Sequence, residues 1–398
     1  MGVYVVMVVL MFHYSEGFSY GHAKLTDISV SQCIAILLVN FVTYWQLSLI
    51  ANVMINPVPL LILSVVDFFV CSVCCYLYTA FYHSYHTPRD ILMIYGTVGS
   101  RDLEEKMSAR SDKYIIREKI SAEQPVEEIC SKIKEHGAVL LNDISSQLRN
   151  DLLKFCYANE IRVYATPKLS DIIISGAEEI CLFDTPLLLV KGKGLNFEQR
   201  FAKRMMDILL SGIAMVVTAP IMLVVAIAIK LEDGGPVFFK QKRATIDGKT
   251  FDILKFRSMI VDAEKFGEVI PATERDPRIT KVGNIIRATR IDELPQIINI
   301  LKGEMSIVGP RPERVEHVEK YTKEIPEFSY RLKVKGGLTG YAQIYGKYNT
   351  SAYDKLRLDL MYIEKYSLLL DIKLILMTLQ IMLRKESTEG FKEDDKKE

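Results

Sequence analysis

Long apolar runs constrain this 398-residue chain most strongly, because about 20 uncharged residues suffice for a helix that crosses a bilayer. One run extends from Ile28 to about Met54 and another from Val58 to Phe81. The second contains a single charge, Asp67, which either lines an ion path or contacts a neighbouring helix. A shorter run, Val3 to Phe12, fits a shortened first span, so the number of full spans stays open. We predict that residues 1–88 form N-terminal transmembrane helices.

A third apolar run, Ile208 to Ile229, is long enough to span the membrane but contains Pro220 near its middle. Proline removes a helical hydrogen bond and kinks the helix. Both ends of the run are basic, and the positive-inside rule places such flanks in the cytoplasm. The flanking residues are Lys191, Lys193, Arg200, Lys203 and Arg204 before it, and Lys230, Lys240, Lys242 and Arg243 after it. This pattern favours a proline-broken re-entrant helix over about 206–230, with a kinked full span as the alternative.

Residues 89–190 have the pattern of a soluble α/β domain. Short apolar runs alternate with helical segments, as in a parallel doubly wound sheet. The predicted strands are "ILMIY", "GAVLLND", "IRVYATP" and "DIIISGAEEI". The first leads into Gly96 and Gly99, which give only G-x-x-G and no complete dinucleotide fingerprint. We therefore predict a degenerate Rossmann-like domain with a structural or regulatory purpose, and keep a nucleotide site as the alternative.

Composition narrows the classes of partner. The chain carries 50 Lys and Arg against 49 Asp and Glu, and this formal net charge of +1 argues against nucleic acid as the main partner. Its seven cysteines lack the pattern of a small secreted framework and fit a reducing compartment. The biased composition of residues 385–398 predicts a charged, disordered tail.

Basic side chains gather in the C-terminal half in patterns typical of phosphate binding. In "FDILKFRSM" an extended strand places Lys255 and Arg257 on one face, where two cations can hold a diphosphate. In "GPRP" two prolines restrict the backbone around Arg311, whose guanidinium matches phosphate oxygens bidentately. Arg287 and Arg290 share a face of a predicted helix. Each alone is typical of a surface charge, but all of them surround one acidic pair in the sequence.

That pair is Asp292 and Glu293 in "RIDELPQ". The simpler interpretation is helix capping, since Pro295 suits a first helical turn and acids complement the helix dipole there. The chemical interpretation gives the acids different roles, because neighbours on an α-helix point about 100° apart. One carboxylate then faces a phosphorus atom while the other holds Mg²⁺ against the same diphosphate. The nearby cations favour the chemical interpretation.

The segment from Arg200 to about Leu383 resembles the catalytic domain of the bacterial sugar transferases, the monotopic polyprenyl-phosphate sugar-1-phosphate transferases. Ordered motifs carry this resemblance over close to half of the chain. They are "KRMMDI", the proline-broken helix, "GPVFFKQKR", "KFRSM", "DELPQ", "LKGEMSIVGPRP", "GLTGYAQIYG" and "DLMYIEKYSLLLDIKLI". The N-terminal spans and the Rossmann-like domain resemble those of the larger members. The resemblance implies an α/β membrane protein with a mixed α/β catalytic domain over residues 199–384.

The resemblance also implies a role for each site residue. Asp292 matches the nucleophile that attacks the β-phosphate of a nucleotide sugar, and Glu293 matches the neighbouring acid that binds Mg²⁺, the implied cofactor. The residues that match phosphate-binding positions are Lys255, Arg257, Arg287 and Arg311. Two loops depart from the family pattern: Ala244-Thr245 stands where Val-Gly is usual, and Gly336-Gly337 lacks the usual proline. These departures put loop shape and sugar choice in question more than the chemistry.

The implied activity is transfer of a sugar-1-phosphate from a nucleotide diphosphate sugar, by resemblance a UDP-sugar, to polyprenyl (undecaprenyl) phosphate. A covalent aspartyl phosphosugar would form, and the nucleoside monophosphate would be released. The reaction would begin an exopolysaccharide, capsule or other surface glycan at the bacterial inner (cytoplasmic) membrane, with the catalytic domain facing the cytoplasm. The expected partners are the nucleotide sugar, the lipid phosphate and the bilayer, with a homo-oligomer left open. The alternative is a non-catalytic membrane transporter or sensor that binds nucleotide sugars.

Overall fold

A computed structural model describes most of the chain. The described residues are 2–20, 25–96, 100–261, 276, 278–346 and 350–382. The predicted charged tail, 385–398, and Gly99 of the glycine turn lie outside them. The chain divides into two compact units, Met1–Lys168 and Leu169–Glu398.

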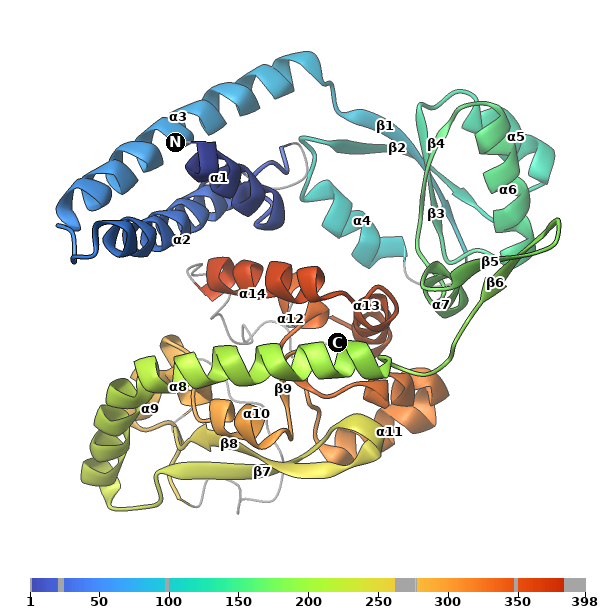
Figure 1. Cartoon of the computed structure of the whole chain (residues 1–398). Coiled ribbons are helices and arrows are strands. Elements are labelled where there is room, and N and C mark those ends of the chain that lie inside the picture. The colour runs from blue at the N-terminus through green and yellow to red at the C-terminus, as the bar shows by residue number, and fades with distance from the viewer. Residues whose placement is uncertain are drawn as a thin grey trace. The chain divides into compact units, whose positions relative to one another are not determined.

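The N-terminal unit begins with three apolar helices, labelled in Figure 1. They are α1 (Gly2–Tyr14), α2 (Leu25–Ala51) and α3 (Val58–Tyr85). α2 and most of α3 are long and apolar enough to cross a membrane, whereas α1 is shorter. Much of the apolar surface of α3 is exposed, with Phe69 63% and Leu61 59% accessible, as expected for side chains that contact lipid. The two predicted spans are therefore present as helices.

Asp67, the acid inside the second span, contacts a neighbouring helix. Its Oδ2 lies 3.2 Å from the hydroxyl of Tyr4 on α1. The same hydroxyl lies 2.8 Å from Oδ1 of Asn40 on α2, and the Asn40 amide donates to Ser64 of α3 at 2.8 Å. Asp67 thus belongs to a polar cluster that joins the three helices, which supports the helix-contact interpretation over an ion path.

A four-stranded parallel sheet follows in the same unit. Its strands are β1 (Arg89–Tyr95), β2 (Tyr114–Ser121), β3 (Ala138–Asn142) and β4 (Arg162–Ala165), in the order β2-β1-β3-β4. Alternate residues of β1 serve two cores, because successive side chains point to opposite faces. Leu92 and Ile94 pack with α5 (Val126–Ile133) and α6 (Ser146–Ala158), whereas Ile91 and Met93 pack with α4 (Ser100–Ser108). Helices thus cover both faces of a parallel sheet, as the sequence predicted.

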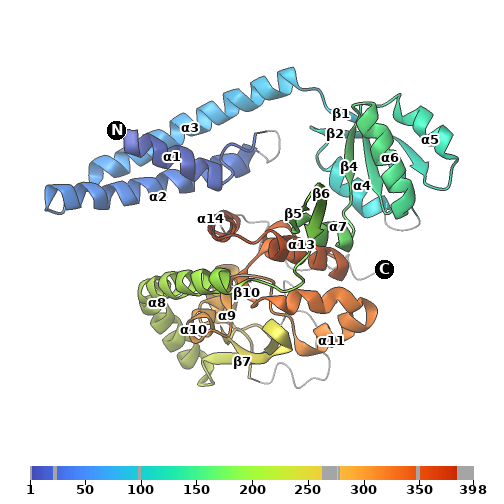
Figure 2. The same cartoon turned by 45° about the vertical axis from the view of Figure 1, so that its right-hand side comes forward.

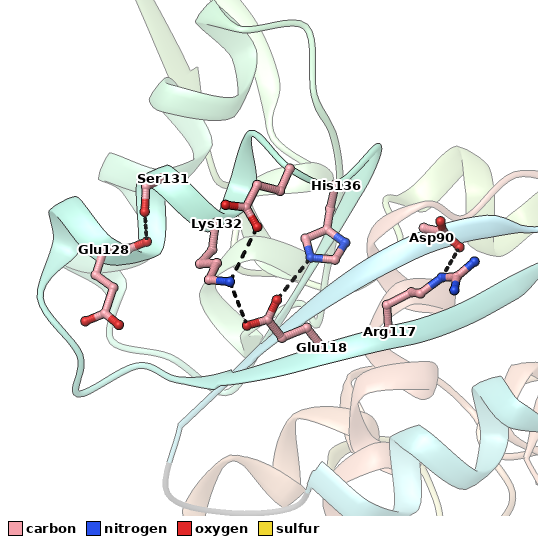
Figure 3. Close-up of polar contacts among 8 residues, drawn as sticks. Asp90, Arg117, Glu118, Glu128, Ser131, Lys132 and His136 are labelled. Atoms are coloured by element: carbon pink, nitrogen blue, oxygen red, sulfur yellow. Dashed lines mark hydrogen bonds and ion pairs between the residues drawn. The ribbon is translucent and has the colours of Figure 1, made fainter.

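Charged side chains of the edge strand β2 pair with residues beyond it (Figure 3). Glu118 accepts from His136 at 3.4 Å and pairs with Lys132 at 3.3 Å, and Arg117 pairs with Asp90 on β1 at 2.9 Å. The hydrogen bond from His136 is the main reason that the pKa of Glu118 lies below its usual value. Charges of this kind on an edge strand discourage pairing with another chain.

The C-terminal unit starts with a segment that the sequence analysis assigned wrongly. The run "DIIISGAEEI" was predicted as one strand, but Leu169–Ser175 forms helix α7. Ile172 is buried among residues of this unit, including Phe328 and Leu356. Such a short apolar run fits either period, so tertiary packing decides its structure. Only the end of the run is extended, in the antiparallel hairpin of β5 (Glu178–Leu182) and β6 (Thr185–Leu189).

Helix α8 (Phe197–Asp233) contains the third apolar run and the proline at position 220. Its ribbon changes direction part-way along its length (Figure 1), as expected where proline interrupts helical hydrogen bonding. Exposed apolar side chains line its central part, including Val216 at 77% and Leu223 at 63%. α8 is the third helix that is long and apolar enough for a membrane, and the protein is an α/β membrane protein.

The remaining elements form a mixed α/β body around α8. The extended parts are the antiparallel pair β7 (Phe238–Ala244) and β8 (Thr250–Phe256) and the parallel pair β9 (Ser306–Val308) and β10 (Gly337–Thr339). The helical parts are η1 (Ile246–Gly248), α9 (Lys281–Ala288), η2 (Ile291–Glu293), α10 (Gln296–Lys302), α11 (Val315–Glu324), η3 (Pro326–Lys333), α12 (Tyr341–Tyr345), α13 (Ala352–Glu364) and α14 (Leu368–Met382). α10 packs between α8 and β8 (Figure 1), and Figure 2 shows it beside α8 after the turn of the view.

Buried polar contacts attach the first half of α8 to this body. Lys203 pairs with Asp371 of α14 at 2.6 Å, and both side chains are almost fully buried. Asp207 accepts from the Ser306 hydroxyl and from the amide of Ile307, each at 3.0 Å, and so holds β9. Arg204 donates to the carbonyl oxygens of Ile300 and Leu301 at 2.6 and 2.7 Å, where α10 ends. The polar start of α8 is therefore part of the folded C-terminal unit.

Candidate active site

Asp292 and Glu293 lie in the short 3₁₀ turn η2, between α9 and α10. Arg290 precedes the turn with a φ of 56°, a left-handed conformation that costs a non-glycine residue roughly 1–2 kcal/mol. Ile291 and Leu294 flank the acids and pack in a cluster with Val225 and Ile229 of α8. The acid pair therefore rests on the second half of the membrane helix.

The position of the acids corrects the sequence-based account of their geometry. They were predicted to sit on an α-helix, but a 3₁₀ turn has three residues per turn, so neighbouring side chains point about 120° apart. α10 begins after Pro295, and no side chain among the described residues caps it. Its first turn also contains no acid. The capping explanation consequently loses its structural basis, while the separate directions of the two carboxylates remain.

Glu293 is held between two cations from different elements. Its Oε1 accepts from Lys255 Nζ at 2.6 Å, from the end of β8, and from Arg311 Nη2 at 3.3 Å. Its side chain is 18% exposed. Burial opposes ionisation, but the charges of Arg311 and Lys255 outweigh it and hold the pKa of Glu293 well below its usual range. Glu293 is thus a fixed anion at neutral pH.

Asp292 has a different environment. Burial raises the pKa of Asp292, and the charge of Glu293 adds to this rise, while Lys255 and Arg287 oppose it. Within the described part of the chain, no ion pair or side-chain hydrogen bond engages the Asp292 carboxylate. A half-buried carboxylate that is not engaged by a neighbour suits attack on an electrophile. The two acids therefore differ in the way that the chemical interpretation requires.

The segment that presents Arg311 is fixed through its backbone. Four consecutive carbonyl oxygens, from Pro310 to Glu313, each accept a hydrogen bond from a different donor. The donors are Gly337 N (2.9 Å), Arg331 Nη2 (3.0 Å), Arg243 Nη1 (3.1 Å) and Ala244 N (3.0 Å), in chain order of the acceptors. Together with the two prolines, these bonds limit the directions in which the guanidinium can point.

A small hollow lies beside the acid turn, and three cations line it. The lining residues are Arg243, Ile253, Lys255, Gln296, Arg311, Pro312, Gly337 and Leu338. Burial and the nearby charge of Arg311 lower the pKa of Arg243 to about 10, so its guanidinium stays charged at neutral pH. Three cations on the wall of the hollow give it the charge that an anionic phosphate group would need. Sequence reasoning missed Arg243 as a site residue, although it ends the motif "GPVFFKQKR".

Arg257 and Arg287, the other two predicted phosphate-binding residues, do not line this hollow. Arg257 is 7% exposed, and its Nη2 forms an ion pair with Asp233 at the end of α8. It therefore anchors the end of α8, and among the described residues no ion pair or hydrogen bond joins it to the acid pair. Arg287 lies in the last turn of α9 and lowers the pKa of Asp292 through its charge. The structure thus places Lys255, Arg287 and Arg311 around the acids.

The two departures from the family pattern contact each other. Thr245 Oγ1 accepts from the amide of Gly336 at 3.3 Å and donates to Glu304 O at 3.1 Å. A proline at position 336 would have no amide to donate, and a glycine at 245 would have no hydroxyl to accept. A Cβ atom at Gly336 would also lie 2.5 Å from Cγ of Pro312. The two positions therefore contact each other beside the segment that carries Arg311.

The acid pair also fits a magnesium ion by its donor chemistry. Mg²⁺ is usually bound through one or two carboxylates together with phosphate oxygens, rather than by a cage of protein ligands. Both cations donate hydrogen bonds to Oε1 of Glu293, and among the described residues no hydrogen bond reaches Oε2. In the described residues, no group of three or more His, Cys, Asp or Glu side chains could hold a metal without a substrate.

Comparison with known proteins identifies the family. A family model described as bacterial sugar transferase matches residues 198–385, which include every residue of the site. A UDP-glucose:undecaprenyl-phosphate glucose-1-phosphate transferase of Caulobacter vibrioides is 41% identical over 186 residues, 46% of this chain and 69% of the relative. The protein belongs to the bacterial sugar transferase family. The resemblance drawn from the sequence motifs is thereby confirmed.

Two other relatives of this bacterial sugar transferase carry related names. A UDP-glucose:undecaprenyl-phosphate glucose-1-phosphate transferase of Klebsiella pneumoniae is 40% identical over 245 residues, 60% of this chain and 51% of the relative. A UDP-N-acetylgalactosamine-undecaprenyl-phosphate N-acetylgalactosaminephosphotransferase of Aeromonas hydrophila is 37% identical over 258 residues, 62% of this chain and 60% of the relative. The chain thus spans a little more than half the length of these two relatives.

Proposed function

We propose that the protein transfers a sugar-1-phosphate from a UDP-sugar to undecaprenyl phosphate, releases UMP, and so begins assembly of a surface glycan. One observation carries this proposal: Glu293 is clamped between Lys255 and Arg311 directly beside the half-buried, unengaged Asp292. The named relatives share UDP donors and undecaprenyl phosphate but differ in the sugar. They therefore support the class of donor and acceptor, and leave the sugar to be determined.

In the proposed reaction Asp292 acts as a nucleophile. Its carboxylate oxygen attacks the β-phosphorus, a new O–P bond forms, and the bond from that phosphorus to the bridging oxygen breaks. UMP leaves with the bridging oxygen. An oxygen of undecaprenyl phosphate then attacks the same phosphorus, and the Asp292 carboxylate is released. Each displacement exchanges one O–P bond for another, so no oxidant or further reactant is needed.

The surrounding residues make an attack of anion on anion feasible. Lys255 and Arg311 would bind phosphate oxygens and offset their charge, because both cations already face the acid turn. Arg243 would hold the nucleotide side of the diphosphate in the hollow. Glu293, with the donor's phosphate oxygens, would hold Mg²⁺, which when bound supplies further charge compensation.

A donor panel tests the proposed function. Purified protein in lipid nanodiscs is incubated with Mg²⁺, undecaprenyl phosphate and one UDP-sugar at a time, and UMP is measured. We expect release with one or a few donors, dependent on the lipid phosphate for multiple turnovers. A protein that binds UDP-sugars but releases no UMP with any of them would instead be a binding or transport protein.

We further propose that α8 is re-entrant and that the catalytic unit faces the cytoplasm. The charged start of α8 is attached to α14 and β9, while its end, at Asp233, is attached to Arg257 after β8. Both ends thus belong to one folded unit, which a full span would place on opposite sides of the membrane. The parallel-sheet unit before it, residues 89 to about 168, we assign as a Rossmann-like accessory domain.

Cysteine labelling tests this topology. In a background without native cysteines, Lys193→Cys and Lys242→Cys should react with a membrane-impermeant maleimide from the cytoplasmic side only, because both are exposed on the flanks of α8. Asn56→Cys, in the turn between α2 and α3, should react from the opposite side and serves as the control. Labelling of positions 193 and 242 from opposite sides would rule out the re-entrant helix.

A further inference from the structure

Arg331 is a buried cation that lies outside every sequence motif of the site. It belongs to η3, and its side chain is 2% exposed. Its Nε donates to Oδ2 of Asp359 on α13 at 2.9 Å, and its Nη2 forms an ion pair with the same oxygen at 2.7 Å. The Asp359 side chain is 1% exposed. Its guanidinium also lies 4.9 Å from the centre of the Phe328 ring. A cation held on this many sides has one orientation.

The same guanidinium reaches the segment that presents Arg311. Its Nη2 donates to the carbonyl oxygen of Arg311 at 3.0 Å. The guanidinium of Arg311 in turn contacts Glu293 at 3.3 Å. A continuous line of contacts therefore runs from Asp359 through Arg331 and Arg311 to the acid turn. The Arg311 side chain is 46% exposed, so its own surroundings fix it less than its backbone does.

We propose that Arg331, oriented by Asp359, is a positioning residue for Arg311 in the reaction proposed above, on which this inference rests. Only a planar fork can bond the carboxylate and the Arg311 carbonyl together in this geometry, because its donors are rigidly spaced. A lysine at position 331 keeps the positive charge that Asp359 needs but offers a single ammonium. It loses the fork that joins the two partners, so the Arg311 segment gains freedom.

An ordinary structural role predicts a different result from the positioning role. A residue that only stabilises the fold changes the amount of folded protein, so its loss lowers activity by the same factor whatever residue stands at 311. A residue that acts through Arg311 loses its effect once the guanidinium of Arg311 is gone. A double-mutant cycle between positions 331 and 311 separates the two.

The cycle uses the full-length protein in nanodiscs. Arg331→Lys should lower kcat/KM for the UDP-sugar about ten- to a hundredfold in the wild-type background, since small misplacements of a binding group have effects of this size. In the Arg311→Gln background, Arg331→Lys should lower kcat/KM by about twofold or less. Arg331→Lys should also weaken the affinity for UDP, measured by calorimetry, more strongly when Arg311 is present than in the Arg311→Gln background. The matched control is Arg357→Lys, also an arginine paired with an aspartate, Asp354, on α13, and it should leave all these values unchanged.

Each outcome decides the inference. Equal losses in the two backgrounds, in turnover and in UDP affinity, would overturn the positioning role. If Arg331→Lys does not fold, Asp359→Asn takes its place in the cycle, because it keeps the shape of the partner and loosens Arg331; the same two expectations apply. Failure of the proposed function looks different, since the wild-type protein would then release no UMP while the cycle in UDP affinity could still be measured.

Discussion

Asp292→Asn should reduce UMP release by at least about a thousandfold, the scale seen when a nucleophile is removed from an active site. The amide keeps the size of the side chain but cannot form the proposed O–P bond. Donor binding should persist, because Lys255, Arg243 and Arg311 remain in place. Turnover and UDP-sugar affinity are measured on the same preparation. Asp252→Asn, an exposed aspartate on β8, is the matched control and should retain full activity.

The same variant distinguishes covalent catalysis from direct attack. Without undecaprenyl phosphate, wild-type protein incubated with Mg²⁺ and a donor labelled in the sugar should retain label on the peptide that contains Asp292. Asp292→Asn should retain none. If both acids served only to bind metal and the lipid phosphate attacked directly, no labelled peptide would form. Substantial activity of Asp292→Asn would rule out its role as nucleophile.

Local patterns were sufficient for much of the fold. α2, α3 and α8 could be predicted because the bilayer demands a length and a hydropathy that sequence displays directly. β1 and β3 could be predicted because a central strand of a parallel sheet is buried on both faces and reads as a near-continuous apolar run. β4, an edge strand with exposed ends, was also predicted, from its place in the alternating pattern of apolar runs and helices. The helix α7 before β5 could not be predicted. The apolar run "DIIIS" is compatible with a strand or a helix, and packing of the segment against Phe328 and Leu356 selects the helix.

Some residues of the candidate site could likewise be predicted from local sequence, and others could not. Asp292, Glu293 and the restricted Arg311 stand out because an adjacent acid pair and a proline-flanked arginine follow one another within about 20 residues. Arg331 does not stand out, since its partners Asp359 and Arg311 are distant in sequence and nothing local separates it from a surface arginine. The conformation of the acid turn was also hidden. That conformation depends on the left-handed backbone of Arg290 and on the contacts of Ile291 with α8. The hydrophobic periodicity of the sequence predicts neither feature.

Glu293→Gln should lower turnover by at least about a hundredfold, the scale of losing one strong electrostatic group in an active site. Glutamine can still accept a hydrogen bond from Lys255 or Arg311, but it no longer neutralises them. The two cations then repel each other across the turn, and the position of Arg311 is no longer fixed by an opposite charge. Glu324→Gln, exposed at the end of α11, should have no effect and controls for the change of net charge.

Titration with magnesium separates the two roles of Glu293. If the carboxylate holds Mg²⁺ with the donor phosphates, the variant should need a higher magnesium concentration for half-maximal rate and should recover part of its activity when magnesium is raised. If Glu293 only balances Lys255 and Arg311, the loss should be the same at every magnesium concentration. We expect the first result, because Oε1 receives both cations and leaves Oε2 for the metal. A loss that does not change with magnesium would remove Glu293 from the metal site and leave it as the anion that orders the two cations.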